Sequence, residues 1–302
     1  MILRQLPDQW IENPPAFLAN LVADPELFPE IRNNSITVYY RGKAVIRDLC
    51  IRGSQICGSI HYKYIPITQP DGNYVGVVFG ERGFEFVPPI APITLGFLDP
   101  NVLAEIKRTV RSTNPGKEGG VIQGAVMRPK NQIVDQEIKF QDVGYRVADK
   151  IDICIFDQHV NGFSLVEVKG IHDNRLIATD GPVPEVINQL QRYRARIEAN
   201  AACLVEAFVR IVELKRSLGL GNRLVEVPEI VPRKIVDRPL LVIGGCSRID
   251  VDEILAVNGR WKPLMDELPK VASGLILCGT TGARLQLAPG PQRLIFESLL
   301  LG

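Results

Sequence analysis

The chain has few of the residues that build metal or redox centres. Its 302 residues include three histidines and six cysteines, and no two cysteines form a Cys-x-x-Cys pair. This scarcity argues against a zinc centre and a disulfide framework, and it is typical of reduced thiols in the cytoplasm. No apolar run reaches the roughly 18 to 20 residues that a membrane helix needs. We therefore expect a cytoplasmic protein without a membrane partner.

Strong net charge, internal repeats and low-complexity segments are absent as well. The net charge is +1, from 35 basic and 34 acidic side chains, which restricts nucleic-acid binding to local patches. A Gly-x-x-x-x-Gly-Lys-Ser/Thr loop is missing, which argues against an enzyme driven by nucleotide hydrolysis. The hydrophobic content of 46% is that of an ordinary globular protein, long enough for two domains.

Short strands predominate in the first part of the chain. After an irregular or short-helical start, β-rich runs separated by Arg-Gly and Asp-Gly turns predict a small, mostly antiparallel β domain. Prolines at 88, 89 and 92 predict a linker, which divides the chain into residues 1–95 and 96–302. The predicted strands are Ser35–Tyr40, Ala44–Ile51, Ser59–Ile67, Tyr74–Phe79 and Phe84–Val87.

Strands and helices alternate after the linker, which favours a mixed central α/β sheet flanked by helices. Asp99 and Pro100 predict the start of a helix that runs to Val110. A long amphipathic helix is predicted from the turn at 180–184 to about Gly219. The remaining predictions are helices at 118–127 and from 250 to about 268, and strands at 132–140, 145–156, 163–169, 239–244 and 274–278.

Two of these strands carry charge where an ordinary core strand would not. The segments Lys150–Asp157 and Phe163–Gly170 are rich in Ile, Val, Leu and Phe, the composition of strands buried on both faces. Because successive side chains alternate between faces, Glu167 and Lys169 share one face. A buried charge is costly unless it is paired or bound to a metal. The convergence of these two residues with Asp152 therefore predicts a functional site.

An Asp on one strand followed by Glu-x-Lys on the next resembles the active-site signature of the PD-(D/E)XK nuclease superfamily. The pattern here is Asp152, then Glu167-Val168-Lys169, with Ile151 in place of the proline that gives the superfamily its name. The resemblance covers about Asn101–Gly279. It implies a restriction-endonuclease-like fold and a metal-dependent hydrolase that cleaves phosphodiester bonds, in DNA rather than RNA.

The resemblance extends to the predicted long helix. Gln189 and Tyr193 lie four residues apart, on one helical face, and are similar to the Gln-x-x-x-Tyr motif of the branch that includes bacterial recombination nucleases. In such enzymes these side chains would contact the substrate phosphate or brace the catalytic Lys169. Glu118, on the helix before the first core strand, matches an acidic residue that often contacts the metal through water.

The resemblance also implies the metal and its ligands. Mg²⁺, for which Mn²⁺ can substitute, would be held by the carboxylates of Asp152 and Glu167 and by the backbone carbonyl of Val168. The metal would activate a water and stabilise the scissile phosphate. Lys169 would orient the attacking water or stabilise developing negative charge.

Other assignments remain open for several of these residues. Asp152 and Lys169 can instead form a buried structural ion pair, with Glu167 at a strand end. Asp149 competes with Asp152 for its role. For the role of Glu118, two further candidates stand on the following strand, Asp135 and Glu137.

Partners and alternative functions follow from the remaining residues. Basic residues around the predicted site, among them Lys107, Arg111 and Arg192, are suited to backbone phosphates. The N-terminal strands carry a mixture of basic and aromatic residues, such as Arg47 and His61. This mixture is suited to binding either unpaired bases or a protein partner. Homo-oligomers are compatible with the sequence. The alternatives to a nuclease are an inactive nucleic-acid-binding or assembly module with the same fold, and an unrelated α/β enzyme with Glu167 as general base.

Overall fold

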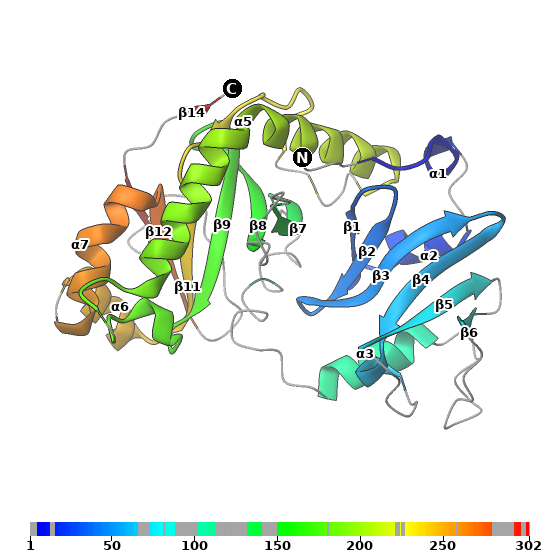
Figure 1. Ribbon diagram of the computed structural model, residues 1–302, viewed down its shortest axis with the longest axis horizontal. Coiled ribbons are helices and arrows are strands. Elements are labelled where there is room, and N and C mark those ends of the chain that lie inside the picture. The colour runs from blue at the N-terminus through cyan, green and yellow to red at the C-terminus, as the bar shows by residue number, and fades with distance from the viewer. Residues whose placement is uncertain are drawn as a thin grey trace. The chain divides into compact units, whose positions relative to one another are not determined.

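The chain forms two compact units, each with its own sheet and helices (Figure 1). The N-terminal unit comprises Leu3–Gly119 and Leu214–Gly221, and the second unit contains Gly120–Glu213 and Asn222–Gly302. Among the described helices, none is both long and apolar enough to cross a membrane. The computed structural model describes residues 5–12, 16–65, 73–80, 83–87, 102–112, 122, 132–140, 150–179, 181–220, 224, 227–257, 259–279, 293–296 and 300–301.

An antiparallel sheet is the centre of the N-terminal unit. Its six described strands lie in sequence order, each hydrogen-bonded to the next, as the alternating strand and turn signals predict. The strands are β1 (Phe28–Ile31), β2 (Ile36–Tyr40), β3 (Lys43–Arg52), β4 (Gln55–His61), β5 (Tyr74–Gly80) and β6 (Gly83–Val87).

The predicted irregular or short-helical start is confirmed, because two short helices, α1 (Asp8–Glu12) and α2 (Ala16–Ala23), precede the sheet. The edge strand β1 was not predicted, and the third predicted strand has another start. The strand predicted from Ser59 begins four residues earlier, in β4. The cause is the β3–β4 hairpin, in which Gly53 has a φ of 61° and the two-residue turn lets pairing begin at once.

Helix α3 (Val102–Ser112) packs with the N-terminal sheet. Ile106 and Val110 are buried in the same apolar core as the strands of this unit. The Lys107 ammonium pairs with the carboxylates of Asp24 and Glu26. By its packing the helix thus belongs with the N-terminal sheet, and not with the 96–302 domain in which the division at residue 95 had placed it.

A mixed sheet is the centre of the second unit, which confirms the predicted α/β character of this part of the chain. Strands β9, β11 and β12 run parallel, whereas β7 and β8 pair antiparallel next to β9. The strands are β7 (Ile133–Lys139), β8 (Lys150–Asp157), β9 (Gly162–Gly170), β10 (Ile235–Val236), β11 (Leu240–Cys246), β12 (Gly274–Gly279), β13 (Arg293–Ile295) and β14 (Leu300–Leu301). The unpredicted β10, β13 and β14 have two or three residues, too few to show a period.

Three helices cover one face of this mixed sheet (Figure 1). They are α5 (Glu185–Ser217), α6 (Arg248–Leu255) and α7 (Lys262–Val271), and their apolar residues form one core with strand residues such as Leu241 and Leu275. Every residue of β9 is buried, as expected for a strand covered on both faces. The helix predicted at 118–127 and the residues 145–149 of a predicted strand lie outside the described residues.

The single helix predicted from residue 250 to about 268 is wrong, because the chain forms two helices there. Val257 and Gly259 have φ values of 52° and 56°, in the left-handed region that ends an α-helix. Helix α6 also begins earlier than predicted, at a capping box in which Ser247 and Asp250 exchange backbone and side-chain hydrogen bonds.

Replacing Ser247 with alanine is expected to lower the free energy of unfolding by about 1 kcal/mol, because the cap satisfies amides of the first helical turn. Hydrogen bonds from Ser247 also lower the pKa of Asp250 below its ordinary value of 3.8. A lowered carboxyl pKa stabilises the fold above that ordinary value, and the contribution is lost as the pH falls through the lowered one. In urea unfolding, the stability difference between Ser247→Ala and wild type should therefore shrink as the pH falls below about 4, and the part that comes from the hydrogen bond of the Asp250 amide to Ser247 should remain. Ser54→Ala, in an exposed turn, is the control; equal stability of Ser247→Ala and wild type at pH 7 would contradict the prediction.

Candidate functional site

The register of the β8–β9 pair brings the predicted acids together. Ile153 lies opposite Val166 and Cys154 opposite Leu165. Continued by one residue, this register places Asp152 opposite Glu167. Residues directly opposite in an antiparallel pair point to the same face, with Cβ atoms about 5 Å apart. The hairpin therefore sets both carboxylates on the face that α5 covers.

The Asp152 side chain occupies a backbone position that the ladder leaves open. The β8–β9 ladder ends at the pair of Ile153 with Val166, and beyond it the Oδ2 atom of Asp152 accepts a hydrogen bond of 2.9 Å from the Val168 amide. In an antiparallel strand the N–H and C=O of one residue point to the same side. The carbonyl of Val168 thus faces the side on which Asp152 lies.

Glu167 and Lys169 form a buried ion pair on the same face. Each residue has 2% of its surface exposed, and the Lys169 ammonium contacts the Oε1 atom of Glu167. Their parallel neighbours on β11 are Leu241 and Ile243, both in the apolar core. The alternative pairing of Lys169 with Asp152 is thus replaced by a pairing with Glu167, and the predicted common face of Glu167 and Lys169 is confirmed.

A chain of hydrogen bonds ties α5 to this pair. The amide of Gln189 donates to the Oε1 atom of Glu167 at 2.8 Å and to the hydroxyl of Tyr193 at 2.7 Å. The Tyr193 hydroxyl in turn donates to the backbone carbonyl of Lys150 at 2.6 Å. The two motif residues of the helix therefore hold the Glu167 carboxylate and the start of β8 in fixed positions.

The charges around Asp152 determine its protonation. Burial raises the pKa of Asp152, and the Glu137 carboxylate acts in the same direction; the Val168 amide and the ammonium groups of Lys169 and Lys150 oppose the rise. A cation near this carboxylate would favour its ionised form. Burial thus disfavours the charged form of Asp152, and a bound cation would favour that form.

Glu137 is brought to Asp152 by the β7–β8 pairing. Gln136 lies opposite Ile153 and Ile138 opposite Ile151, so Glu137 faces Asp152. Its φ of 51° is unusual for a residue with a side chain, and such strained positions concentrate at functional sites.

Among the other candidates for these roles, the structure describes Asp135, which lies opposite Cys154 on β8. Asp135 is fully buried and accepts a hydrogen bond from the Gln136 amide. Glu118 and Asp149 lie outside the described residues. Lys150 is a residue that the sequence reasoning did not select: its ammonium pairs with Glu137, and its position at the open end of β8 was the only available signal.

Two of the predicted phosphate contacts, Lys107 and Arg111 on α3, are held in ion pairs. Lys107 and Arg111 pair with acids of their own unit, and Arg111 also donates to the Tyr40 hydroxyl at 2.6 Å. On α5, the Arg194 guanidinium pairs with Glu198. These contacts neutralise three of the cations that the sequence offered as a basic surface.

The donor atoms present suit a hard divalent cation. Mg²⁺ prefers oxygen ligands and uses one or two carboxylates while it keeps several waters. Asp152 and Glu167 supply two carboxylates, and the Val168 carbonyl supplies a third oxygen on the same side. Among the residues that the structure describes, no group of three or more His, Cys, Asp or Glu is close enough to hold a metal by side chains alone.

Solvent reaches the parts of the site to different degrees. Asp152 is half-buried, whereas Glu167 and Lys169 are buried. An open pocket of about 720 Å³ lies at the first turn of α5, where Arg175, Thr179 and Asn188 line it. Asn188 precedes Gln189 on the helix, so this pocket adjoins the hydrogen-bonded chain without including the ion pair.

Comparisons of the chain with protein-family models, with curated proteins and with solved structures found no match.

Proposed function

We propose that this protein is a metal-dependent nuclease of the PD-(D/E)XK type, with a restriction-endonuclease-like second unit, that hydrolyses phosphodiester bonds in DNA. The observation that carries the proposal is the arrangement of Asp152, Glu167, Lys169, Gln189 and Tyr193. An ion pair and hydrogen bonds join the last four, and Asp152, opposite Glu167 in the strand register, accepts a hydrogen bond from the Val168 amide. Five residues selected from sequence motifs meet on one face of two adjacent strands and the helix above them. A buried pair kept for stability alone is seldom favoured over apolar packing.

The residues of the site take distinct roles in this proposal. Asp152, Glu167 and the Val168 carbonyl hold Mg²⁺ or Mn²⁺. The ion, when bound, supplies an activated water and charge that stabilises the phosphorane. Lys169 stabilises the negative charge that develops on the phosphate oxygens.

Gln189 and Tyr193 act as positioning residues. Gln189 fixes the Oε1 atom of Glu167, and Tyr193 fixes Gln189 against the Lys150 carbonyl. Glu137, which faces Asp152, is the described acid best placed for the outer role that the sequence resemblance gave to Glu118.

Binding of the metal is expected to stabilise the protein. At about 100 times its dissociation constant, Mg²⁺ should add about 2.7 kcal/mol to the free energy of unfolding. Asp152→Asn keeps an acceptor for the Val168 amide but loses the charge, so its melting temperature should not respond to Mg²⁺. Differential scanning calorimetry with and without EDTA measures both. An equal Mg²⁺ response of the two proteins would place the metal elsewhere.

The direct test is cleavage of plasmid, linear duplex and single-stranded DNA by purified protein with Mg²⁺ or Mn²⁺. Wild type should cut at least one substrate and should stop cutting in EDTA. Lys169→Ala should be inactive. Equal cutting by wild type and Lys169→Ala would reject the assignment, since the activity would then come from another site or another protein.

The burial of Glu167 and Lys169 favours one second candidate, an inactive nucleic-acid-binding or assembly module with the same fold. A module of this kind should bind DNA with no response to divalent cations. Asp152→Ala would then leave the affinity for DNA unchanged.

A further inference from the structure

One face of the N-terminal sheet points away from the apolar core of its unit. Register pairs across β3, β4 and β5 place Arg47 opposite Ser59, His61 opposite Tyr74, and Ser59 opposite Gly76. Alternate residues on these strands, such as Ile60, Val75 and Val77, point into the core. The side of the sheet that carries the paired residues Arg47, Ser59, His61 and Tyr74 is named the outer face. Its members, all half-buried, are Arg47, Cys57, Ser59, His61, Tyr74, Gly76 and Val78.

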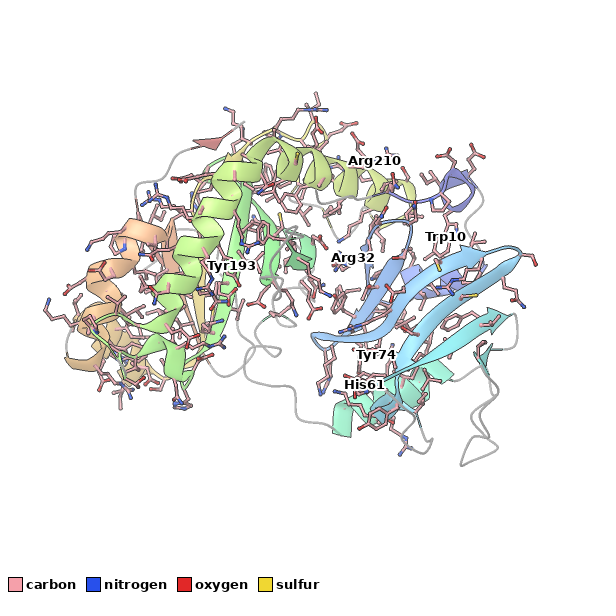
Figure 2. All side chains as sticks on the ribbon, in the orientation of Figure 1. Trp10, Arg32, His61, Tyr74, Tyr193 and Arg210 are labelled. Carbon is pink, nitrogen blue, oxygen red and sulfur yellow. The ribbon has the colours of Figure 1, made fainter. Side chains whose placement is uncertain are left out.

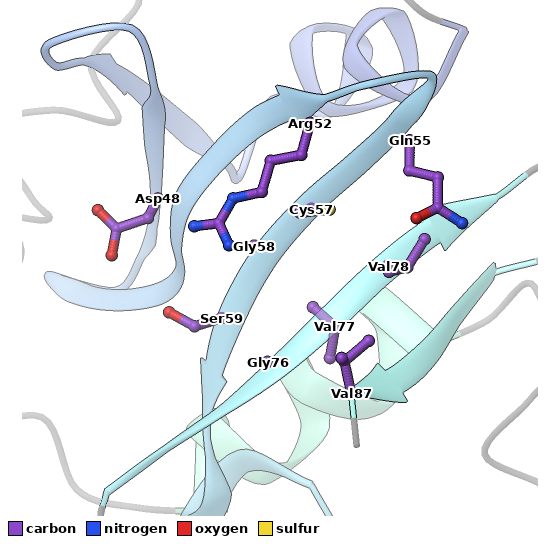
Figure 3. Close-up of a pocket in the computed structure, with 10 residues that line it drawn as sticks. All are labelled: Asp48, Arg52, Gln55, Cys57, Gly58, Ser59, Gly76, Val77, Val78 and Val87. Atoms are coloured by element: carbon purple, nitrogen blue, oxygen red, sulfur yellow. The ribbon is translucent and has the colours of Figure 1, made fainter. Parts of the chain in front are cut away.

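The outer face is hollowed along its middle (Figure 3). A pocket of about 470 Å³ lies over Cys57, Ser59 and Gly76, with Arg52 and Gln55 from the hairpin end of β3 and β4 at its border. A Cβ atom at residue 76 would stand 3.0 Å from the Val87 carbonyl oxygen, so glycine is required for this approach of β6. The hollow is therefore built into the strand pairing.

Aromatic rings gather at the other end of the hollow (Figure 2). The His61 ring lies 5.0 Å from the Tyr74 ring and 5.0 Å from the Tyr62 ring, measured between centroids. The Arg47 guanidinium stacks over Tyr74, with Cζ 4.4 Å from the centroid. Aromatic rings and stacked guanidinium planes are both surfaces on which nucleic-acid bases stack.

Positive charge is concentrated around these rings. The pKa of His61 is lowered, first by burial and then by the charges of Lys63 and Arg47. The pKa of Lys43 is lowered in the same way, by burial and by Lys63. The His61 ring is therefore neutral at pH 7, and its Nδ1 atom accepts a hydrogen bond of 3.3 Å from the Lys63 amide.

The described residues that line the hollow include one acid, Asp48, exposed at its border, and one cation, Arg52. Arg47 and Lys63 add two cations beside the rings, and the strand register places Glu85 of β6 opposite Val78. These residues amount to three cations and two acids, an excess of one positive charge. An elongated hollow with rings, guanidinium planes and excess positive charge complements a flexible anion that carries flat apolar groups.

We propose that the outer face binds single-stranded nucleic acid, with unpaired bases on the Tyr74 and His61 rings. Arg52 and Lys63 contact the backbone phosphates on the two sides of the hollow. Duplex DNA does not satisfy this surface, because its bases are already stacked and are not free to lie on the rings. The proposal rests on the proposed function for the identity of the ligand, and it assigns a single-stranded substrate, or a single-stranded part of one, to the nuclease.

Binding is measured by fluorescence anisotropy of the full-length protein with a labelled oligothymidylate of roughly 20 nucleotides, longer than the site of one small sheet domain. EDTA is present, so cleavage plays no part. We expect the single strand to bind more tightly than a duplex of the same length. Tyr74→Leu, which keeps an apolar side chain but removes the ring, should weaken binding about tenfold, the loss of one stacked base.

The phosphate contacts are tested by the salt dependence of the same titration. Two cations that contact phosphates of a single strand contribute about 1.4 to the slope of log affinity against log salt. The double variant Arg52→Ala/Lys63→Ala should lose this amount. Lys262→Ala, on the exposed surface of α7, is the matched control and should keep the wild-type slope.

A footprint locates the bound strand independently of any variant. Cys57 lines the hollow, whereas Cys203 is exposed on α5. With reductant present, the oligonucleotide should slow alkylation of Cys57 by iodoacetamide and leave Cys203 unaffected. Equal rates at Cys57 with and without the oligonucleotide would overturn the proposal.

Two other results would overturn it as well. Equal affinity for single strand and duplex, together with full binding by Tyr74→Leu, would show that the outer face attracts nucleic acid by charge alone. No measurable binding of single strands would assign the outer face to a protein partner instead. Both results are compatible with cleavage by wild type and its loss in Lys169→Ala, so the inference can fail while the proposed nuclease stands. Binding without cleavage would reject the nuclease alone.

Discussion

The double variant Glu167→Gln/Lys169→Met is expected to fold with nearly wild-type stability and to lose most of its nuclease activity. The two side chains form an ion pair with 3% of each side chain exposed. Breaking such a pair by one replacement leaves an uncompensated buried charge, at a cost of about 3 to 5 kcal/mol. Replacing both partners by uncharged groups of similar volume removes that cost. Gln189 can still donate a hydrogen bond in the variant, because the amide that replaces the Glu167 carboxylate keeps one acceptor oxygen.

This series separates a structural role of the pair from a catalytic one. Lys169→Met and Glu167→Gln should each lower the free energy of unfolding, and the double variant should recover most of the loss. Activity should follow another pattern, with a fall of about 100- to 10,000-fold in each of the three proteins, because the reaction needs the Glu167 charge to hold the metal and the Lys169 charge to stabilise the phosphate. Urea unfolding and a cleavage assay measure the two quantities.

Lys270→Met serves as the control, since its ammonium is exposed and pairs with Glu267 on the surface of α7. It should match wild type in stability and in cleavage. A stable double variant that cleaves at the wild-type rate would show that Glu167 and Lys169 serve packing alone, and the nuclease proposal would be withdrawn.

The second large effect is expected in the N-terminal unit, at Lys215. Its ammonium lies 2.6 Å from the Oε2 atom of Glu30, and the two residues are 5% and 2% exposed. Lys215 stands in the last turn of α5, and Glu30 in the edge strand β1. Lys215→Met should lower the free energy of unfolding by about 3 to 5 kcal/mol, because the Glu30 carboxylate stays buried after its cation is removed.

The measurement is urea unfolding of the full-length protein at pH 7. Lys262→Met is the matched control: its ammonium pairs with Asp266 at 2.7 Å, with 63% and 48% of the side chains exposed, and a surface pair contributes about 0 to 1 kcal/mol. Glu30→Gln added to Lys215→Met should recover part of the loss. Equal unfolding midpoints for the Lys215→Met and Lys262→Met proteins would contradict a stabilising role for the buried pair.

Prediction from sequence succeeded where one local signal was strong enough. The apolar composition of the segments around Asp152 and Glu167 predicted both strands. It failed where two signals competed. Between residues 250 and 268 the apolar period continues through α6 and α7, but the left-handed residues Val257 and Gly259 interrupt the backbone.

The candidate site was predictable in its members and not in its contacts. Motif spacing selected Asp152, Glu167, Lys169, Gln189 and Tyr193. It could not choose which acid pairs with the lysine, because both acids share its face of the sheet. Glu137 was one of several acids of equal standing until the β7–β8 register set it opposite Asp152.

The amino-acid sequence by itself determined the longer strands and the long helix α5, and which charged residues enter buried strands, because both depend on local period and composition. Tertiary structure decided the rest: the partner of Lys169, the packing of α3 with the N-terminal sheet, and the grouping of Arg47, His61 and Tyr74 on one face. These depend on strand register and on the packing of residues far apart in the chain. Local preference carries no information about either.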